Sequence, residues 1–331
     1  MTRIFFILLL LISIFQINSE NALTFAKMME DVKKIKKLKK IAVIGGDNLT
    51  MLQCCRKAKD MGLADSILIG DAEKTKLLAK EANIDISDFQ LIDLNKPQII
   101  ALTATLLVRD GKADILAKGS LDTAYCLKAI FDRKYGLKRS EHVSGISLFE
   151  IPNYNKFLIF TDPHVIPYPT LNQKITLINN AVEFANSIGI KNPKVAVVTA
   201  NYKVNPKMRE TVDADRLKKM NEIGQIKNCI VDGPLSFELA ANPVIPKYKI
   251  ENRKIKGDAD IVLFPEINSA NIAYNLMIHG IQGKSGTLLS GTSAPVIFNS
   301  RSESAQEKLN SLVLSMFYSE HLQKKTQKFL N

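Results

Sequence analysis

The sequence predicts an α/β protein with mainly parallel sheets and flanking helices. Short apolar runs alternate with longer amphipathic stretches through most of its 331 residues. Many of these runs end in glycine, lysine or hydroxyl residues, which is typical of a strand that turns into a helix. With 46% hydrophobic residues, a chain of this length can bury more than one core.

The first half of the chain repeats the strand-helix pattern four times. Strands are expected at 41–44, 66–69, 89–92 and 113–117. Helices are expected at 24–39, 48–61, 71–83 and 96–110. The turn after the first strand, Gly45-Gly46, lacks the G-x-G-x-x-G spacing, so it does not indicate a dinucleotide site. Strands joined through helices in this way lie parallel to one another.

A change of pattern at residue 143 predicts a second lobe. Apolar segments within 143–162 flank a polar Pro-Asn-Tyr-Asn turn, as in a hairpin. After it, helices are expected at 170–188, 206–222 and 235–241, and strands at 194–198, 228–232 and near 260 and 296. The long helix after Ser302 should pack back on the first lobe. We therefore expect a first lobe of residues 23–142 plus 295–331 and a second lobe of residues 143–294.

The overall charge favours anionic partners. The net charge is +12 and the isoelectric point is near 9.4. Phe and Tyr are scattered without an RNA-binding pattern and no zinc spacing occurs, so we expect small anions and no nucleic acid. The four cysteines, which have no redox or metal spacing, are expected to be reduced and buried: Cys54, Cys55, Cys126 and Cys229.

Residues 1–22 form a hydrophobic leader. Arg3 precedes an apolar block at 4–14, and a cut after Ser19 would fit a secretory signal. Alternatively the leader is translated from upstream and the true start is Met28 or Met29. The block is too short for a stable membrane span. Reduced thiols favour the cytoplasm, and the leader leaves secretory targeting open.

Two strand ends carry residues suited to bind an anion. Ser300 and Arg301 follow a strand and precede a long helix, where the helix dipole, backbone donors and the guanidinium all favour negative charge. Lys118-Gly119-Ser120, followed by Thr123, repeats this arrangement. Two such turns suggest one shared cleft. The alternative is that Ser300 and its neighbours only cap the helix and that Lys118 is solvated beside a turn glycine.

Ordered motifs run through nearly everything after residue 25. They are Lys118-Gly119-x-x-x-Thr123, Thr161-Asp162, Gln173-Lys174, Asn180-Ala181-Val182, Val204 to Met208 with Thr211 and Asp213-Ala214, Asp232-Gly233-Pro234-Leu235, Gly257-Asp258-Ala259-Asp260 with Pro265, Asn271-Ile272, and Ser300-Arg301-Ser302. In these motifs the chain resembles the phosphate acetyl/butyryl transferase family, and its butyryl branch more than its acetyl branch.

The resemblance implies a two-lobed fold like that of isocitrate and isopropylmalate dehydrogenases, with a cleft between the lobes, usually in a homodimer or larger homo-oligomer. It implies that acyl-CoA and inorganic phosphate give acyl phosphate and CoA, with butyryl-CoA favoured. No bound cofactor or metal is implied, because the coenzyme A thioester is itself a substrate.

The resemblance also implies roles for individual residues. Ser300 and Arg301 would be catalytic. Glu307 would also be catalytic, since the acetyl branch carries an aspartate seven positions after the serine, although Glu303 lies nearer. The phosphate- and CoA-binding residues would be Lys118, Gly119, Ser120, Thr123, Ser144, Asn271 and Ser302.

Four positions depart from the family pattern. Gly145 replaces a histidine, Tyr202 a glutamate, Ala270 a glycine and Asn275 a lysine. Three alternatives therefore stay open beside phosphate butyryltransferase: a phosphate acetyltransferase, a homologue that binds CoA and phosphate without turnover, and a dehydrogenase. A dehydrogenase would need a carboxylate cluster and a nicotinamide site, and the sequence indicates neither.

Overall fold

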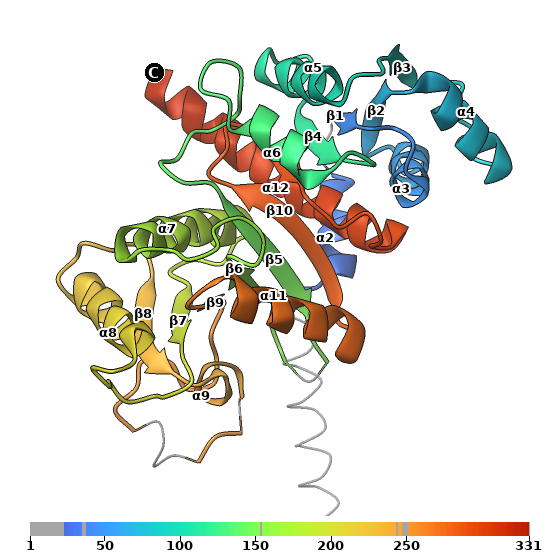
Figure 1. Ribbon diagram of the computed structural model, residues 1–331. Coiled ribbons are helices and arrows are strands. Elements are labelled where there is room, and N and C mark those ends of the chain that lie inside the picture. The colour runs from blue at the N-terminus through green and yellow to red at the C-terminus, as the bar shows by residue number, and fades with distance from the viewer. Residues whose placement is uncertain (1–22, 35–37, 153, 243, 247–250, 331) are drawn as a thin grey trace, which may run out of the picture.

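The computed structural model describes residues 23–34, 38–152, 154–242, 244–246 and 251–330. The expected leader at 1–22 lies outside these residues. Within them the chain forms a mixed α/β fold in which eleven strands join one sheet, in the order β3-β2-β1-β4-β11-β10-β5-β6-β9-β7-β8. Helices flank this sheet (Figure 1).

The first half of the chain forms the elements expected there. The strands are β1 (Lys39–Ile44), β2 (Ala64–Gly70), β3 (Gln90–Asp93) and β4 (Ile115–Lys118), all parallel. The helices are α2 (Phe25–Val32), α3 (Leu49–Asp60), α4 (Ala72–Glu81), α5 (Pro97–Arg109) and α6 (Thr123–Ile130). The expected helix at 24–39 was too long. Lys39 instead begins β1, and its buried ammonium lies 2.6 Å from a Glu320 carboxylate oxygen.

The hairpin expected at 143–162 is confirmed as β5 (Ser144–Glu150) antiparallel to β6 (Leu158–Thr161). The strands after it are β7 (Lys194–Val198), β8 (Ile230–Leu235), β9 (Ile261–Leu263) and β11 (Val296–Ile297). The helices after it are α7 (Leu171–Ser187), α8 (Arg209–Glu222), α9 (Phe237–Ala241), α11 (Ile267–Asn275), a π-helical turn η1 (Leu276–Gly280), and α12 (Ala305–Leu330).

Strand β10 (Lys284–Ser290) was not expected from the sequence. It pairs antiparallel with both β5 and β11 in the middle of the sheet. Its sequence, KSGTLLS, contains only two large apolar residues because α12 packs closely against it. A Cβ atom added at Gly286 would lie 2.8 Å from a methyl carbon of Leu314. Small residues here let the helix approach the strand, and they also remove the usual apolar strand signal.

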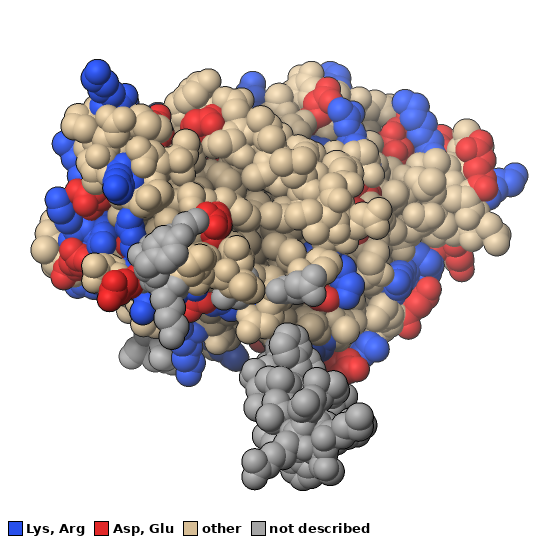
Figure 2. Space-filling model, turned by 90° about the horizontal axis from the view of Figure 1, so that it is seen from below, with Lys and Arg blue, Asp and Glu red and all other residues tan. Residues whose placement is uncertain are grey.

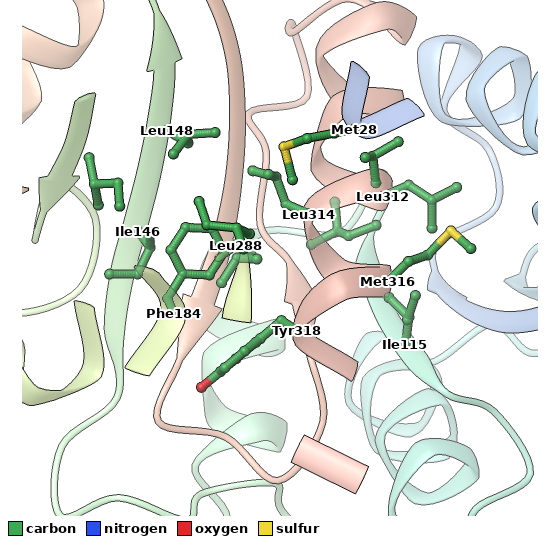
Figure 3. Packing of buried hydrophobic residues seen from close by; sticks show 14 of the residues in the cluster. Met28, Ile115, Ile146, Leu148, Phe184, Leu288, Leu312, Leu314, Met316 and Tyr318 are labelled. Carbon is green, nitrogen blue, oxygen red and sulfur yellow. The ribbon is translucent and has the colours of Figure 1, made fainter. Parts of the chain in front are cut away.

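Helix α12 packs on the middle strands of the sheet, β4, β11 and β10, and its side chains lie in the core (Figure 3). It contacts α2 and α3, as expected for a helix packed on the first lobe, and it also contacts β10 and α7. Leu314 and Tyr318 of α12 are buried in the same cluster as Leu288 of β10 and Phe184 of α7. The rings of Tyr318 and Phe184 meet nearly at right angles, 6.0 Å apart.

The thiols agree with the expectation from the sequence, and charged side chains of both signs lie on the surface. On the face shown in Figure 2, the described Lys, Arg, Asp and Glu side chains lie mainly toward the edges, and they form no continuous basic band. The four cysteines are free and buried. In the part of the chain that the structure describes, no helix combines the length and apolar character needed to cross a membrane.

Candidate active site

The two turns that the sequence predicts to bind an anion both contribute to the lining of one cavity of about 580 Å³. Lys118 and Thr123 line it from the end of β4 and the start of α6. Ser300 and Arg301 line it from the loop between β11 and α12, and Asn271 lines it from α11. Five of the ten predicted site residues therefore share one cavity.

A larger cavity, of about 710 Å³, lies elsewhere and contains none of the predicted residues. It is bounded by α7, α12 and the loop at Arg139. Its carboxylate, Glu183, is already paired with Arg139 and with Lys325. Volume alone would select this cavity. The smaller cavity is selected because it contains five of the predicted residues and a buried ammonium, that of Lys118, which forms no hydrogen bond or ion pair with a described residue.

Lys118 is a buried lysine whose ammonium forms no ion pair with a described residue. Only 4% of its surface is exposed, and within the described residues it makes no hydrogen bond or ion pair. Burial lowers the pKa of its ammonium and the Arg301 charge adds to this, while the carboxylates of Asp122 and Glu303 offset part of the effect without reaching hydrogen-bond distance. A buried charge is costly unless it is paired, so this position favours an anionic ligand in the cavity.

Arg301 lies at the exposed edge of the same cavity. Its guanidinium lies 3.0 Å from a carboxylate oxygen of Asp122, and Nη1 donates to the Ser120 carbonyl over 3.4 Å. More than half of the Arg301 side chain is exposed. An exposed ion pair of this kind is weak, so the fork is free to exchange Asp122 for a ligand phosphate.

The loop that carries Ser300 and Arg301 is held by Lys308, which sequence reasoning missed. Lys308 lies on the second turn of α12 and is almost fully buried. Its ammonium donates to the carbonyls of Ser300 and Glu303 over 3.1 and 2.7 Å, and to the Thr50 hydroxyl over 2.8 Å. From the sequence alone, a lysine on a helix is predicted to lie at the surface. The carbonyl and hydroxyl groups that accept its hydrogen bonds come together only in the folded structure.

Glu303, not Glu307, is the carboxylate in the cavity. Glu303 is 7% exposed and accepts hydrogen bonds from the Tyr274 hydroxyl (2.9 Å), the Ser300 backbone N–H (2.5 Å) and the Asn299 amide. Burial raises its pKa. The remaining amide oxygen of Asn299 is buried without a hydrogen-bond partner in the described structure.

Glu307 instead forms a capping box with Ser304 at the start of α12. Its carboxylate accepts from the Ser304 N–H over 2.7 Å, while the Ser304 hydroxyl accepts from the Glu307 N–H over 3.2 Å. Glu307 does not line the cavity. The cap is therefore made by Ser304 and Glu307, and Ser300 and Ser302 do not supply it.

The structure places the other four predicted residues beside the cavity rather than in its lining. A Cβ atom at Gly119 would lie 2.0 Å from the Gly45 carbonyl oxygen, so this glycine lets β1 and β4 approach at their ends. The Ser120 hydroxyl donates to Asp47. Ser144 is buried and accepts from Asn180 over 3.0 Å, and the Ser302 hydroxyl lies 3.0 Å from that of Ser300.

Two of the four departures from the family pattern lie at the cavity. Asn275 lines it and donates to the carbonyl of Asn271 over 2.9 Å. Gly145 lies behind it, where a Cβ atom would come within 3.0 Å of His164. The space of a side chain at 145 is thus occupied by an imidazole from residue 164. Ala270 is fully buried, and Tyr202 is an exposed residue outside the lining.

His164 is a cavity residue that no spacing in the sequence indicated. It lines the cavity, and its Nε2 lies 3.1 Å from the Ser147 hydroxyl of β5. Burial lowers the pKa of its imidazole to about 4. Its ring meets that of Tyr274 edge to face at 4.8 Å. A lone histidine in a loop carries no recognisable pattern, because its neighbours Ser147 and Tyr274 come from other elements, β5 and α11.

The comparisons with known proteins point to phosphate acyltransferases. The family described as phosphate acetyl/butaryl transferase matches residues 23–100 and 98–316. The chain is 38% identical to a phosphate butyryltransferase of Clostridium acetobutylicum, over 85% of this chain and 94% of that protein. It is 34% identical to a phosphate acetyltransferase of Thermotoga maritima, over 85% and 95%. A branched-chain phosphotransacylase structure from Enterococcus faecalis V583 aligns with a TM-score of 0.75 and 28% identity, over 86% of this chain and 100% of that chain.

Proposed function

The chain belongs to the phosphate acetyl/butyryl transferase family, and from this premise we propose that it transfers a short acyl group between coenzyme A and inorganic phosphate. Acyl-CoA and phosphate give acyl phosphate and free CoA, reversibly. Butyryl-CoA is the favoured substrate because the motif set resembles the butyryl branch, and acetyl-CoA is the alternative.

The main support for the proposal is the position of the Lys118 ammonium, which is buried and, among the described residues, unpaired. This ammonium forms no hydrogen bond or ion pair with a described residue, and it lies in a cavity that also contains Arg301 and the Ser300 hydroxyl. Phosphate bound there would supply the missing negative charge to Lys118 and two oxygens to the Arg301 fork.

The reaction follows from these positions. An oxygen of hydrogen phosphate attacks the thioester carbon, the carbon–sulfur bond breaks, and the phosphate proton ends on the sulfur of CoA. Holding both reactants in one complex supplies much of the rate. Ser300 donates a hydrogen bond to the oxyanion that forms on the carbonyl. Glu303 passes the proton, because its raised pKa keeps it closer to a carboxylic acid at neutral pH than an exposed glutamate.

A thiol-release assay tests this function. Purified protein is given acetyl-, propionyl- or butyryl-CoA with and without phosphate, and free thiol is followed by a thiol-reactive dye. We expect release that requires phosphate and is fastest with butyryl-CoA. Sulfate in place of phosphate is the matched control, since it is a similar tetrahedral anion. Binding of CoA by calorimetry without turnover of any thioester would instead favour the non-catalytic homologue.

We further propose that the cavity lies between two lobes, in an arrangement like that of isocitrate dehydrogenase, and that the chain forms a homodimer. The lobe division is supported by the lining, because Lys118 and Arg301 come from 23–142 and 295–331 while His164 and Asn271 come from 143–294. Sedimentation gives the oligomeric state. X-ray scattering with and without CoA and phosphate tests whether the lobes close on the ligands.

A further inference from the structure

The loop that carries His164 is fixed by one buried carboxylate. Asp162 follows β6 and is 4% exposed. Its two oxygens accept from the backbone N–H groups of Gly145 (2.8 Å), His164 (3.0 Å), Val165 (3.1 Å) and Ile166 (2.9 Å). The backbone of residue 164 is therefore held to β5 and to the turn after β6, so the imidazole has a defined starting point at the cavity wall.

The contacts of the imidazole show which edge of the ring is unused. Nε2 meets the Ser147 hydroxyl, and Cδ2 lies 2.9 Å from the Cβ position of Gly145. These two ring atoms are neighbours, so Nδ1 lies on the opposite edge, away from β5. Nδ1 makes no hydrogen bond within the described part of the chain. A half-buried ring nitrogen without a protein partner, on a residue that lines the cavity, is available to a ligand.

The charge state of the ring limits what it can do. With a pKa of about 4, the imidazole is neutral near pH 7 and carries one proton. The Ser147 hydroxyl, which lies 3.2 Å from the Thr287 hydroxyl, can donate to Nε2 and leave that proton on Nδ1. A neutral N–H is a hydrogen-bond donor for an uncharged or developing oxygen, and it adds no third cation to a site that already has Lys118 and Arg301.

We propose that His164 is a substrate-contacting residue that donates a hydrogen bond from Nδ1 to the carbonyl oxygen of the acyl group. This inference rests on the acyl transfer proposed above. The imidazole stays neutral throughout, so no proton is moved by it. The oxyanion would then have two donors, Ser300 and His164, and the lining beside His164 offers apolar surface for the acyl chain in Pro163 and Phe298.

Three substitutions separate a contact through Nδ1 from a structural role. An asparagine side chain places its amide near the position of Nδ1, and a glutamine places its amide near Nε2. We expect His164→Phe and His164→Gln to lower kcat about 100-fold with the KM for phosphate within about twofold of wild type, as for loss of an oxyanion donor. His164→Asn should stay within about tenfold of wild-type kcat. Equal kcat losses in all three, with thermal midpoints falling in parallel, would mean that His164 only packs.

A second measurement does not depend on turnover. The chain has four histidines, so the imidazole 15N spectrum is small and His164→Asn assigns the missing signals. A non-reactive CoA thioether that keeps the acyl carbonyl should shift the Nδ1–H signal of His164, and free CoA should not. No shift, or the same shift with both ligands, overturns the contact. Absence of turnover with a ligand-specific shift would instead refute the acyl transfer and leave the contact standing.

Discussion

Replacing Lys118 by methionine should make the protein more stable and its binding of phosphate worse. Most substitutions in a buried site destabilise, so the sign of the first effect is diagnostic. Lys118 is 4% exposed and forms no ion pair with a described residue, and burial already lowers its pKa. Methionine keeps the length of the side chain and removes the charge that the fold has to desolvate.

The magnitude follows from the cost of a buried charge. Burying an ion costs several kcal/mol of desolvation free energy even after the protein relaxes around it, and an ion without an ion-pair partner recovers little of this cost. We therefore expect Lys118→Met to raise the free energy of unfolding by about 1 to 3 kcal/mol. In a chain of this size that is a few degrees in the thermal midpoint. Loss of one charge-assisted hydrogen bond, about 1.5 to 3 kcal/mol, should raise the KM for phosphate by about 10- to 150-fold.

Lys308→Met is the matched control. Lys308 is equally buried, but its ammonium is bonded to the Thr50 hydroxyl and to loop carbonyls, so its loss leaves buried acceptors unsatisfied. We expect it to lower the free energy of unfolding by about 2 to 5 kcal/mol. The assays are denaturant unfolding without phosphate, and thiol release over a phosphate series. If Lys118→Met destabilises like the control and its phosphate KM is unchanged, Lys118 serves the fold and does not bind the anion.

Four more predictions concern the same site. Arg301→Lys keeps the charge and loses the fork, so kcat should fall about 100-fold, or about 3 kcal/mol; near wild-type kcat would show that the guanidinium holds no phosphate. Glu303→Gln should lower kcat by about 100-fold, whereas Glu307→Gln keeps an acceptor for the capping box and should change kcat and stability little; the reverse result would mean that Glu307 transfers the proton. Butyryl-CoA should exceed acetyl-CoA in kcat/KM by a factor worth about 1 to 3 kcal/mol, and a clear acetyl preference contradicts this. Because the folded pKa of His164 is lowered to about 4, the free energy of unfolding of wild type minus that of His164→Asn should rise by about 2 to 3 kcal/mol between pH 4 and pH 6.5; taking this difference removes the opposite contribution of Asp162, whose pKa burial raises to about 6.

Much of the fold was predictable because its strands are buried on both faces and read as apolar runs. β1, β2 and β7 lie within two residues of the expected bounds at each end. β10 was missed for a physical reason: the close contact of α12 requires Gly286 and small hydroxyl residues, and these are the residues that normally signal a loop. Where close packing requires small side chains, a strand lacks the apolar pattern from which it could be predicted.

The candidate site was predicted where a local motif carries it. Lys118, Ser300 and Arg301 stand at strand ends, a position that periodicity can locate, and they do meet in one cavity. His164 and Lys308 could not be found in this way. Each gains its environment from residues far along the chain, Ser147 and Gly145 for the imidazole and Thr50 with the loop carbonyls for the ammonium.

Helix α12 connects the loop of the candidate site to the hydrophobic core. Its first turns carry the capping box and Lys308, which together set the loop of Ser300, while Leu314 and Tyr318 farther along are clamped against β10 and α7. A helix transmits displacement along its axis with little loss. Substitutions of core side chains near Leu314 would then shift α12 and change the position of the Ser300 hydroxyl. Sequence change in the core of such an enzyme is therefore limited by activity as well as by stability.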